Sequence, residues 1–257
     1  MLPIPHPSRS RSQPGPLVWY AASSCHDWRL AEVFRRVLCC LQEKGLFGSP
    51  DHLSVLSLST GKERAFPSPF ADADAMLRCV SKRMKSFVLQ ARGTAPRPWD
   101  LGLSVQPMLG STGFVRGVNT VYLEFELPTP GDRDWSELLA EAFEQVHTGA
   151  DTEFAFIHPK TGLDDLTDGA YDPPVTVGPL FRGVLWANLL GADLLDEFEL
   201  KALRGLPAEN LRHDPASRSL WFYGADSIAG ATQDEDRLVA LTQAVRAALR
   251  PESRFSG

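Results

Sequence analysis

Cysteine is scarce in this sequence and is not arranged for metal binding or redox catalysis. The chain has 257 residues and four cysteines. No two of them form the Cys-x-x-Cys pair that zinc sites and thiol redox motifs use. Cys39 and Cys40 are adjacent within an amphipathic helical pattern. We therefore expect buried free thiols in a reducing compartment.

Long hydrophobic runs are also missing. No run approaches the roughly 18 apolar residues that a membrane-spanning helix needs, so no membrane contact is expected. Residues 1–16, MLPIPHPSRSRSQPGP, are rich in Pro, Ser and Arg and lack the continuous apolar core of a signal peptide. We expect a disordered tail over residues 1–16, a short tail over residues 252–257, and a cytoplasmic location.

Established catalytic motifs are a third absence. The sequence contains no P-loop, no Gly-rich dinucleotide turn after a strand, no HExxH and no GxSxG. Its six histidines are scattered without the spacing of metal ligands. Hydrophobic residues make up 43% and charged residues 23%, which is typical of a globular protein. These features favour a protein that is not an enzyme and has no cofactor.

The clearest structural signal is residues 118–127, VNTVYLEFEL. Val121, Leu123, Phe125 and Leu127 fall on alternate positions, which is the period of a half-buried strand. Pro128 ends the pattern, because a proline cannot donate to a β-ladder. A strand is therefore predicted at the middle of the chain.

Helical periodicity follows this strand. Its apolar positions are Trp135, Leu138, Leu139, Ala142, Phe143 and Val146. Further helices are predicted over residues 28–44, from Ser68 through Val88, over residues 193–203, and after a capping pattern at Thr232. Gly45 suits the end of the first of these helices. Further strands are predicted over residues 17–22, 53–58, 152–157 and 219–223, with residues 101–105 and 114–127 forming a hairpin.

These elements predict an α+β fold, a mainly antiparallel sheet with packed helices, in one domain over residues 17–251. The order strand, helix, strand occurs twice, and Trp28 and Trp135 each stand at the helix start. This echo is typical of an internal strand–helix–strand duplication, and equally of the common βαβ rhythm.

Charge is distributed unevenly along the chain. The net charge is −6, yet residues 1–100 carry fourteen Lys/Arg and eight Asp/Glu. Residues 124–172 carry thirteen Asp/Glu and two Lys/Arg, a balance of −11. Such asymmetry indicates an interaction surface. The alternative is that the acidic residues solvate an exposed face.

Two groups of acidic residues in this region are predicted to bind a partner. The first group is spaced four and three apart, so a helix presents it on one side: Glu137, Glu141 and Glu144. The second group lies in an acidic loop: Asp164, Asp165, Asp168 and Asp172. The loop superficially suggests a calcium site, but its third and twelfth positions are Leu166 and Val175, which are not oxygen ligands.

Several segments together resemble a known family. They are residues 113–128 (GFVRGVNTVYLEFELP), the helix that begins at Trp135, residues 178–195 (GPLFRGVLWANLLGADLL), and residues 219–226 (SLWFYGAD) with the capped last helix. Over roughly residues 17–250 the chain resembles bacterial immunity proteins that neutralise polymorphic or type VI-secreted toxins. Within this family it is similar to the group paired with restriction-endonuclease-like DNase toxins.

The resemblance implies a cytoplasmic inhibitor that binds a cognate nuclease toxin and has no catalytic residues, no cofactor and no nucleic-acid ligand of its own. An acidic inhibitor matches the cationic groove that a nuclease offers to DNA. Two other functions stay open. One is an enzyme of unrecognised type with a metal at residues 164–172, and the other is an adaptor subunit of a secretion apparatus.

Overall fold

The computed structural model describes residues 16–23, 29–66, 86–106, 118–127, 135–150, 152–161, 163 and 183–251. Within these ranges the chain forms ten strands in one sheet, and every pair of neighbouring strands is antiparallel. The predicted α+β fold with a mainly antiparallel sheet is therefore confirmed. No helix among the described residues is long and apolar enough to cross a membrane.

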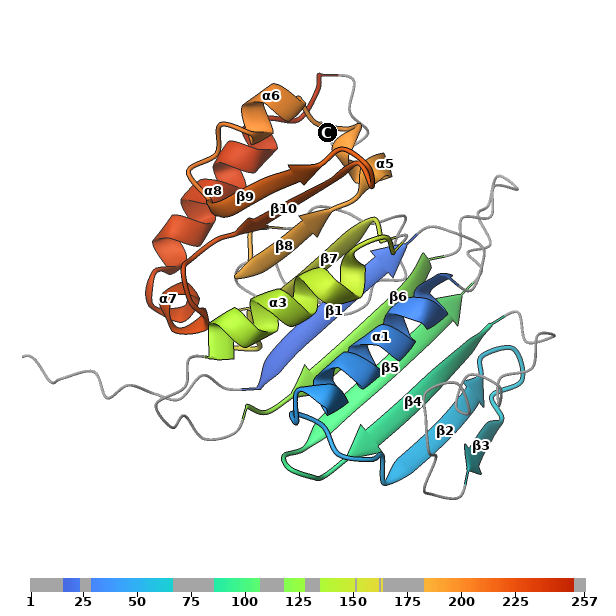
Figure 1. The fold of residues 1–257 in the computed structure, drawn as a ribbon. Helices are drawn as coiled ribbons and strands as arrows, with labels where there is room; N and C mark the ends of the chain where they lie inside the picture. The colour runs from blue at the N-terminus through green and yellow to red at the C-terminus, as the bar shows by residue number, and fades with distance from the viewer. Residues whose placement is uncertain are drawn as a thin grey trace, which may run out of the picture.

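The strands follow the sheet in the order β3-β2-β4-β5-β6-β1-β7-β8-β10-β9 (Figure 1). Their bounds are β1 (Leu17–Ser23), β2 (His52–Ser57), β3 (Glu63–Phe66), β4 (Phe87–Gly93), β5 (Trp99–Gln106), β6 (Val118–Phe125), β7 (Phe154–Pro159), β8 (Ala187–Leu190), β9 (Glu209–Asp214) and β10 (Ser219–Tyr223). The first strand of the chain thus lies at the centre, between β6 and β7.

Two longer helices, α1 and α3, lie side by side over the central strands (Figure 1). The helices described are α1 (Arg29–Glu43), α3 (Trp135–His147), α5 (Ala192–Leu195), α6 (Leu200–Leu203), α7 (Ile228–Gln233) and α8 (Glu235–Ala247). As predicted, Gly45 lies just beyond the end of α1 and has a φ of +72°. The amides of Gly45 and Leu46 donate to the carbonyls of Gln42 and Leu41, a helix end that favours glycine.

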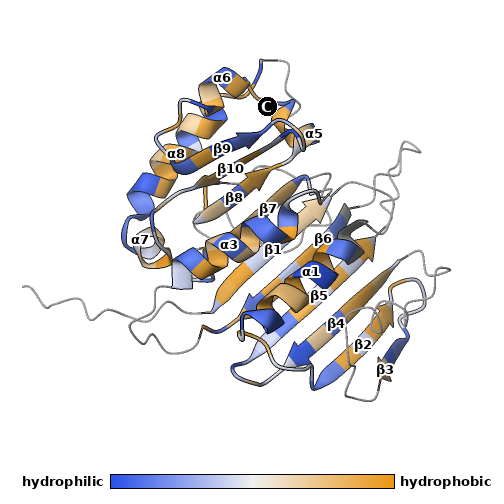
Figure 2. Cartoon of the chain, viewed as in Figure 1, coloured by the Kyte–Doolittle hydropathy of each residue, from blue (hydrophilic) through white to orange (hydrophobic). Residues whose placement is uncertain are grey.

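The strand register explains the alternation seen in the sequence. Trp19 pairs with Leu123 on one side and with Ile157 on the other, and Leu123 pairs with Leu101. Paired residues of an antiparallel sheet share a face, so these buried side chains form a stripe beneath α1 and α3. Figure 2 shows the corresponding bands of hydrophobic and hydrophilic residues along the strands.

The reverse face of the sheet changes character from one half to the other. On β5 and β6 it carries polar residues, such as the paired Asp100 and Glu124. Glu124 accepts hydrogen bonds from Lys160 at 2.8 Å and from Tyr122 at 2.7 Å. On β10 it carries Leu220 and Phe222, which are fully buried. Both faces of the sheet are therefore covered at the β8–β10 end.

Helix α8 packs at this β8–β10 end. The amide of Val184 donates to the Thr242 hydroxyl at 2.7 Å. Gly224 follows β10 and lies so close to Leu238 of α8 and to the Leu185 carbonyl that a side chain has no room there. This close approach accounts for a glycine at the end of a buried strand.

Three predicted elements differ from the structure. Phe87 and Val88, predicted as the end of a helix, begin strand β4, and the rest of that predicted helix lies outside the described residues. The helix predicted over residues 193–203 is two single turns, interrupted where Phe198 bridges to Leu249. Thr232 lies within α7, and the residue that caps α8 is Asp234, whose carboxylate accepts from the Arg237 amide at 3.1 Å.

The internal duplication suggested by the sequence is not shown by the fold. Strands β1 and β2, which flank α1, are separated in the sheet by β4, β5 and β6. Strands β6 and β7, which flank α3, are separated by β1 alone. The two strand–helix–strand segments thus occupy the sheet differently.

The assignment of faces along β6 predicts the cost of two substitutions. Phe125 is 2% exposed and its ring lies 5.8 Å from that of Phe47, whereas the neighbouring Glu126 is exposed. Phe125→Ala should lower the free energy of unfolding by about 3–5 kcal/mol. Glu126→Ala should change it by less than about 0.5 kcal/mol. Denaturant titration measures both values, and equal losses would contradict the assigned faces.

Candidate functional site

Helix α3 positions the predicted helix carboxylates along its length, from Glu137 in its first turn to Glu144 near its end. Leu139, Ala142, Phe143 and Val146 are fully buried against the sheet, so the opposite side of the helix faces outward. Glu137 and Glu141 are exposed, and Glu144 is half-buried. The helix therefore presents these three side chains outward, as their spacing predicts. The predicted loop residues Asp164, Asp165, Asp168 and Asp172 lie outside the described residues.

Glu141 and Glu144 line one groove, which separates α3 from strand β9 and the turn that follows it. Its volume is about 650 Å³. The lining residues are Glu141, Glu144, Gln145 and Thr148 from α3, and Arg212, His213, Asp214 and Pro215 from β9 and its turn. Glu137 is not among them. We call this hollow the α3–β9 groove.

Both carboxylates in the α3–β9 groove have cationic partners. Glu141 accepts from the Lys44 ammonium at 2.8 Å, and this hydrogen bond and the positive charge lower the pKa of Glu141. Its side chain nevertheless stays 71% exposed, while that of Lys44 is 16% exposed. Glu144 lies 2.9 Å from the Arg212 guanidinium. The acidity of this surface is thus partly compensated from within the protein.

The surroundings of Glu144 fix its position more tightly. Tyr223 Oη lies 3.4 Å from Glu144 Oε1 and donates to it. Burial, together with this negative charge, raises the pKa of Tyr223, so the phenol stays protonated and keeps donating. Arg212 lies over the ring of Trp221, with 5.8 Å between the guanidinium carbon and the ring centroid. Contacts with Tyr223 and Arg212 therefore hold the Glu144 carboxylate in position before any partner binds.

A second, smaller hollow of about 190 Å³ lies between α1 and α3. We call it the α1–α3 hollow. Its lining residues are Arg35, Arg36, Cys39, Cys40, Glu43, Gln145 and Val146. Among the described cysteines, Cys39 and Cys40 are both free, and Cys40 is buried, as expected. Burial raises the pKa of the Cys40 thiol, which makes it a poor nucleophile.

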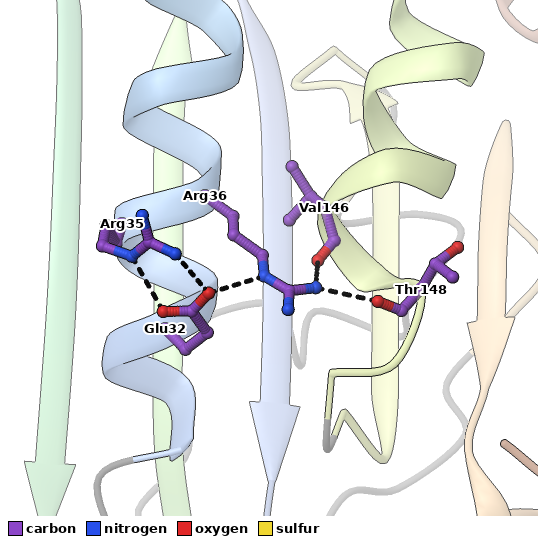
Figure 3. A network of polar contacts seen from close by, with 5 residues as sticks. All are labelled: Glu32, Arg35, Arg36, Val146 and Thr148. Atoms are coloured by element: carbon purple, nitrogen blue, oxygen red, sulfur yellow. Dashed lines mark hydrogen bonds and ion pairs between the residues drawn. The ribbon is translucent and has the colours of Figure 1, made fainter.

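Arg36 joins α1 to the end of α3 at this hollow, and Arg35 binds Glu32 of its own helix (Figure 3). Arg36 Nη1 donates to the carbonyls of Val146 at 3.2 Å and Thr148 at 2.8 Å, so a cation of α1 caps the end of α3. Glu32 accepts from Arg35 at 2.6 Å and from Arg36 at 2.8 Å. The hydrogen bond from Arg35, together with that from Arg36, lowers the pKa of Glu32 to about 2. Partial burial acts in the opposite direction but is outweighed.

His147, at the end of α3, is buried and linked to the central strand. Trp19 Nε1 donates to His147 Nε2 at 3.0 Å, and His147 Nδ1 lies 3.1 Å from Thr152 Oγ1. Since an indole N–H can only donate, the proton of the neutral imidazole is on Nδ1 and is donated to Thr152. Burial, aided by the charge of Arg36, lowers the pKa of His147 to about 3. This histidine is a neutral structural link.

The described residues hold no group of three His, Cys, Asp or Glu side chains that could bind a metal. The metal-site alternative concerned residues 164–172, all of which lie outside the described residues. It is therefore untested.

Sequence reasoning did not identify the cations that complete this surface. Lys44 lies 97 positions from Glu141, and Arg212 belongs to a strand that was not predicted. Arg36 lies within the polar side of a predicted helix and carries no local signal of its contact with the end of α3. These partners are set by the tertiary packing of α1, α3 and β9.

Comparison with solved structures finds a similar fold. The chain is similar to a protein of the type VI secretion system (T6SS) of Pseudomonas aeruginosa, PA0821, with a TM-score of 0.55 and 16% sequence identity. The match covers 91% of this chain and 74% of that chain. No protein-family model matches the chain, and no curated protein matches it. At this identity the likeness establishes a shared fold.

Two buried histidines predict how stability depends on pH. Burial lowers the pKa of His158, like that of His147, to about 3. Unfolding restores values near 6.5, so below pH 6.5 the unfolded state binds more protons and stability falls. From pH 6.5 to 5 each histidine should cost about 1.6 kcal/mol. Carboxylates such as Glu32 add their losses below about pH 4.5.

The variant His147→Gln isolates one of these two contributions. Urea titrations at pH 7.5, 6.5, 5.5 and 5 give the free energy of unfolding of each protein. Between pH 6.5 and 5 the variant should lose about 1.6 kcal/mol less than the wild type. Parallel curves for both proteins would show that His147 does not titrate on unfolding.

Proposed function

We propose that this chain is a T6SS-related protein that acts by binding another protein, and that it is an immunity protein for a cognate nuclease toxin. The observation that carries the T6SS assignment is the fold shared with a T6SS protein over 91% of the chain. The resemblance of residues 113–128 and 178–195 to immunity proteins carries the finer assignment. A DNase toxin threatens cytosolic DNA, so the proposal locates the protein in the cytoplasm.

The acidic region supports an inhibitor of a nuclease. A nuclease binds the phosphate backbone through a cationic groove, and an acidic inhibitor is drawn to the same groove. In this proposal Glu137, Glu141 and Glu144 of α3 face the toxin together with the acidic residues of the loop at 164–172. Lys44 and Arg212 compensate two of the helix carboxylates. Long-range attraction therefore depends mostly on Glu137 and the loop.

Co-expression tests the proposed function directly. The toxin domain encoded beside this gene is expressed in bacteria with and without this chain, and colony counts and DNA integrity are measured. An immunity protein should restore growth and intact DNA. An adaptor subunit of the secretion apparatus would leave toxicity unchanged and would instead copurify with apparatus proteins. Unchanged killing by an expressed, active toxin would contradict the immunity function.

The charge dependence of association gives a kinetic prediction. Reversal of the acidic residues to Lys should slow association with the toxin at low salt more than it speeds dissociation. The difference from wild type should fade as the Debye length falls from about 10 Å at 0.1 M to about 3 Å at 1 M. The two variants to compare, by surface-immobilised binding, are Asp164/Asp165/Asp168→Lys and Glu137/Glu141/Glu144→Lys.

The helix variant needs a control, because it also breaks the ion pairs with Lys44 and Arg212. Neutral replacement, Glu141/Glu144→Gln, reports the structural cost of those pairs, which for exposed pairs is about 1 kcal/mol or less each. A melting temperature close to wild type qualifies the variant for the binding assay. If both Lys variants associate as fast as wild type at low salt, the acidic residues only solvate the surface.

A further inference from the structure

The outer side of the α1–α3 pair is a ridge between two hollows. Gln145 lines both the α1–α3 hollow and the α3–β9 groove. Glu141 and Thr148 lie four residues before it and three after it, so the three side chains follow one line along α3. A partner that packs on this surface must therefore straddle the ridge rather than enter a single pocket.

The two sides of the ridge differ in their balance of charge. The α1–α3 hollow is lined by Arg35, Arg36 and Glu43, and the α3–β9 groove by Glu141, Glu144, Asp214 and Arg212. On the α1–α3 hollow, the Arg36 guanidinium donates to the carbonyls of Val146 and Thr148. The Arg35 side chain is ion-paired with Glu32 and is 38% exposed. On the α3–β9 groove, the most exposed charge of the ridge is Glu141, at 71%. A complementary surface must offer an anion on one side of the ridge and a cation on the other.

The surface is held in place before any partner arrives. Cys40 Sγ lies 3.5 Å from Gln145 Oε1, Lys44 binds Glu141, and Arg36 caps the end of α3. These three contacts all join α1 to α3. Side chains that are already ordered lose little entropy on binding, which favours their use in a specific interface.

We propose that the toxin presents a carboxylate to Arg35 and a cation to Glu141, one on each side of the Gln145 ridge. This inference rests on the proposed function, because the toxin is the partner in question. It assigns the α1–α3 surface to a mixed-charge part of the toxin. In this arrangement the toxin's cationic DNA-binding groove contacts other acidic residues of the 124–172 region.

Single charge reversals test this arrangement. The probe is the purified toxin domain encoded beside this gene, made inactive by mutation, and the readout is Kd by calorimetry at 0.1 M salt. Arg35→Glu and Glu141→Lys should each weaken binding about tenfold. Exposed residues on other elements provide matched controls, namely Lys201→Glu in α6 and Glu63→Lys in β3. Both controls should bind within about twofold of wild type.

The direction of the Arg35 effect decides the outcome. A uniformly cationic partner would bind Arg35→Glu more tightly than wild type, because a like charge is removed, and that result would overturn the inference. Unchanged affinity of Arg35→Glu would also overturn it, while the proposed function would stand. Arg35→Gln, which avoids repulsion from Glu32, should show part of the loss if the fold is intact. A wild-type chain that does not bind the toxin would reject the proposed function itself.

Discussion

The insertion of β1 between β6 and β7 is the constraint on which the rest of the structure depends. This strand pairs along its length with β6 on one side and with β7 on the other, and it alone connects the five strands on one side of it to the four on the other. Its side chains are almost all buried. Trp19 also fixes helix α3 to this strand, since its ring packs on Phe143 and its N–H donates to His147, both of α3.

The surface at α3 inherits its geometry from this central strand. Trp19 and Trp221 both contact Phe143, so α3 is positioned by both halves of the sheet. α1 is then fixed against α3 by Arg36 and Lys44. The two hollows beside Gln145 thus follow from packing beneath them. A partner that binds there would contact a rigid part of the molecule, which suits a high-affinity inhibitor.

Local patterns predicted those elements whose burial is one-sided. The alternation of Val121, Leu123 and Phe125 identified β6, because one face of this strand meets α1 and α3 and the other is largely polar. The same reasoning failed at Phe87 and Val88. Their apolar spacing also fits a helix, and what makes them a strand is their pairing with β5, the other arm of a hairpin, and with β2, some thirty residues earlier.

The candidate site was predictable in part for the same reason. The spacing of Glu137, Glu141 and Glu144 is local, so their common side of α3 followed from the sequence. Their electrostatic state did not, because Lys44 and Arg212 come from distant segments. Counting charge along the chain overstated the acidity of α3, since it could not include cations brought there by folding.

The place of β1 also sets the order in which the protein can be completed. Trp19 meets His147 across 128 positions of chain, and β7, the second neighbour of β1, follows later still. Contacts of such separation carry a large loop-closure entropy and are associated with slow folding. On the ribosome, β1 emerges long before either neighbouring strand has been synthesised. During that interval a largely apolar strand has neither of its native neighbours, and an unpaired apolar strand tends to pair with other chains.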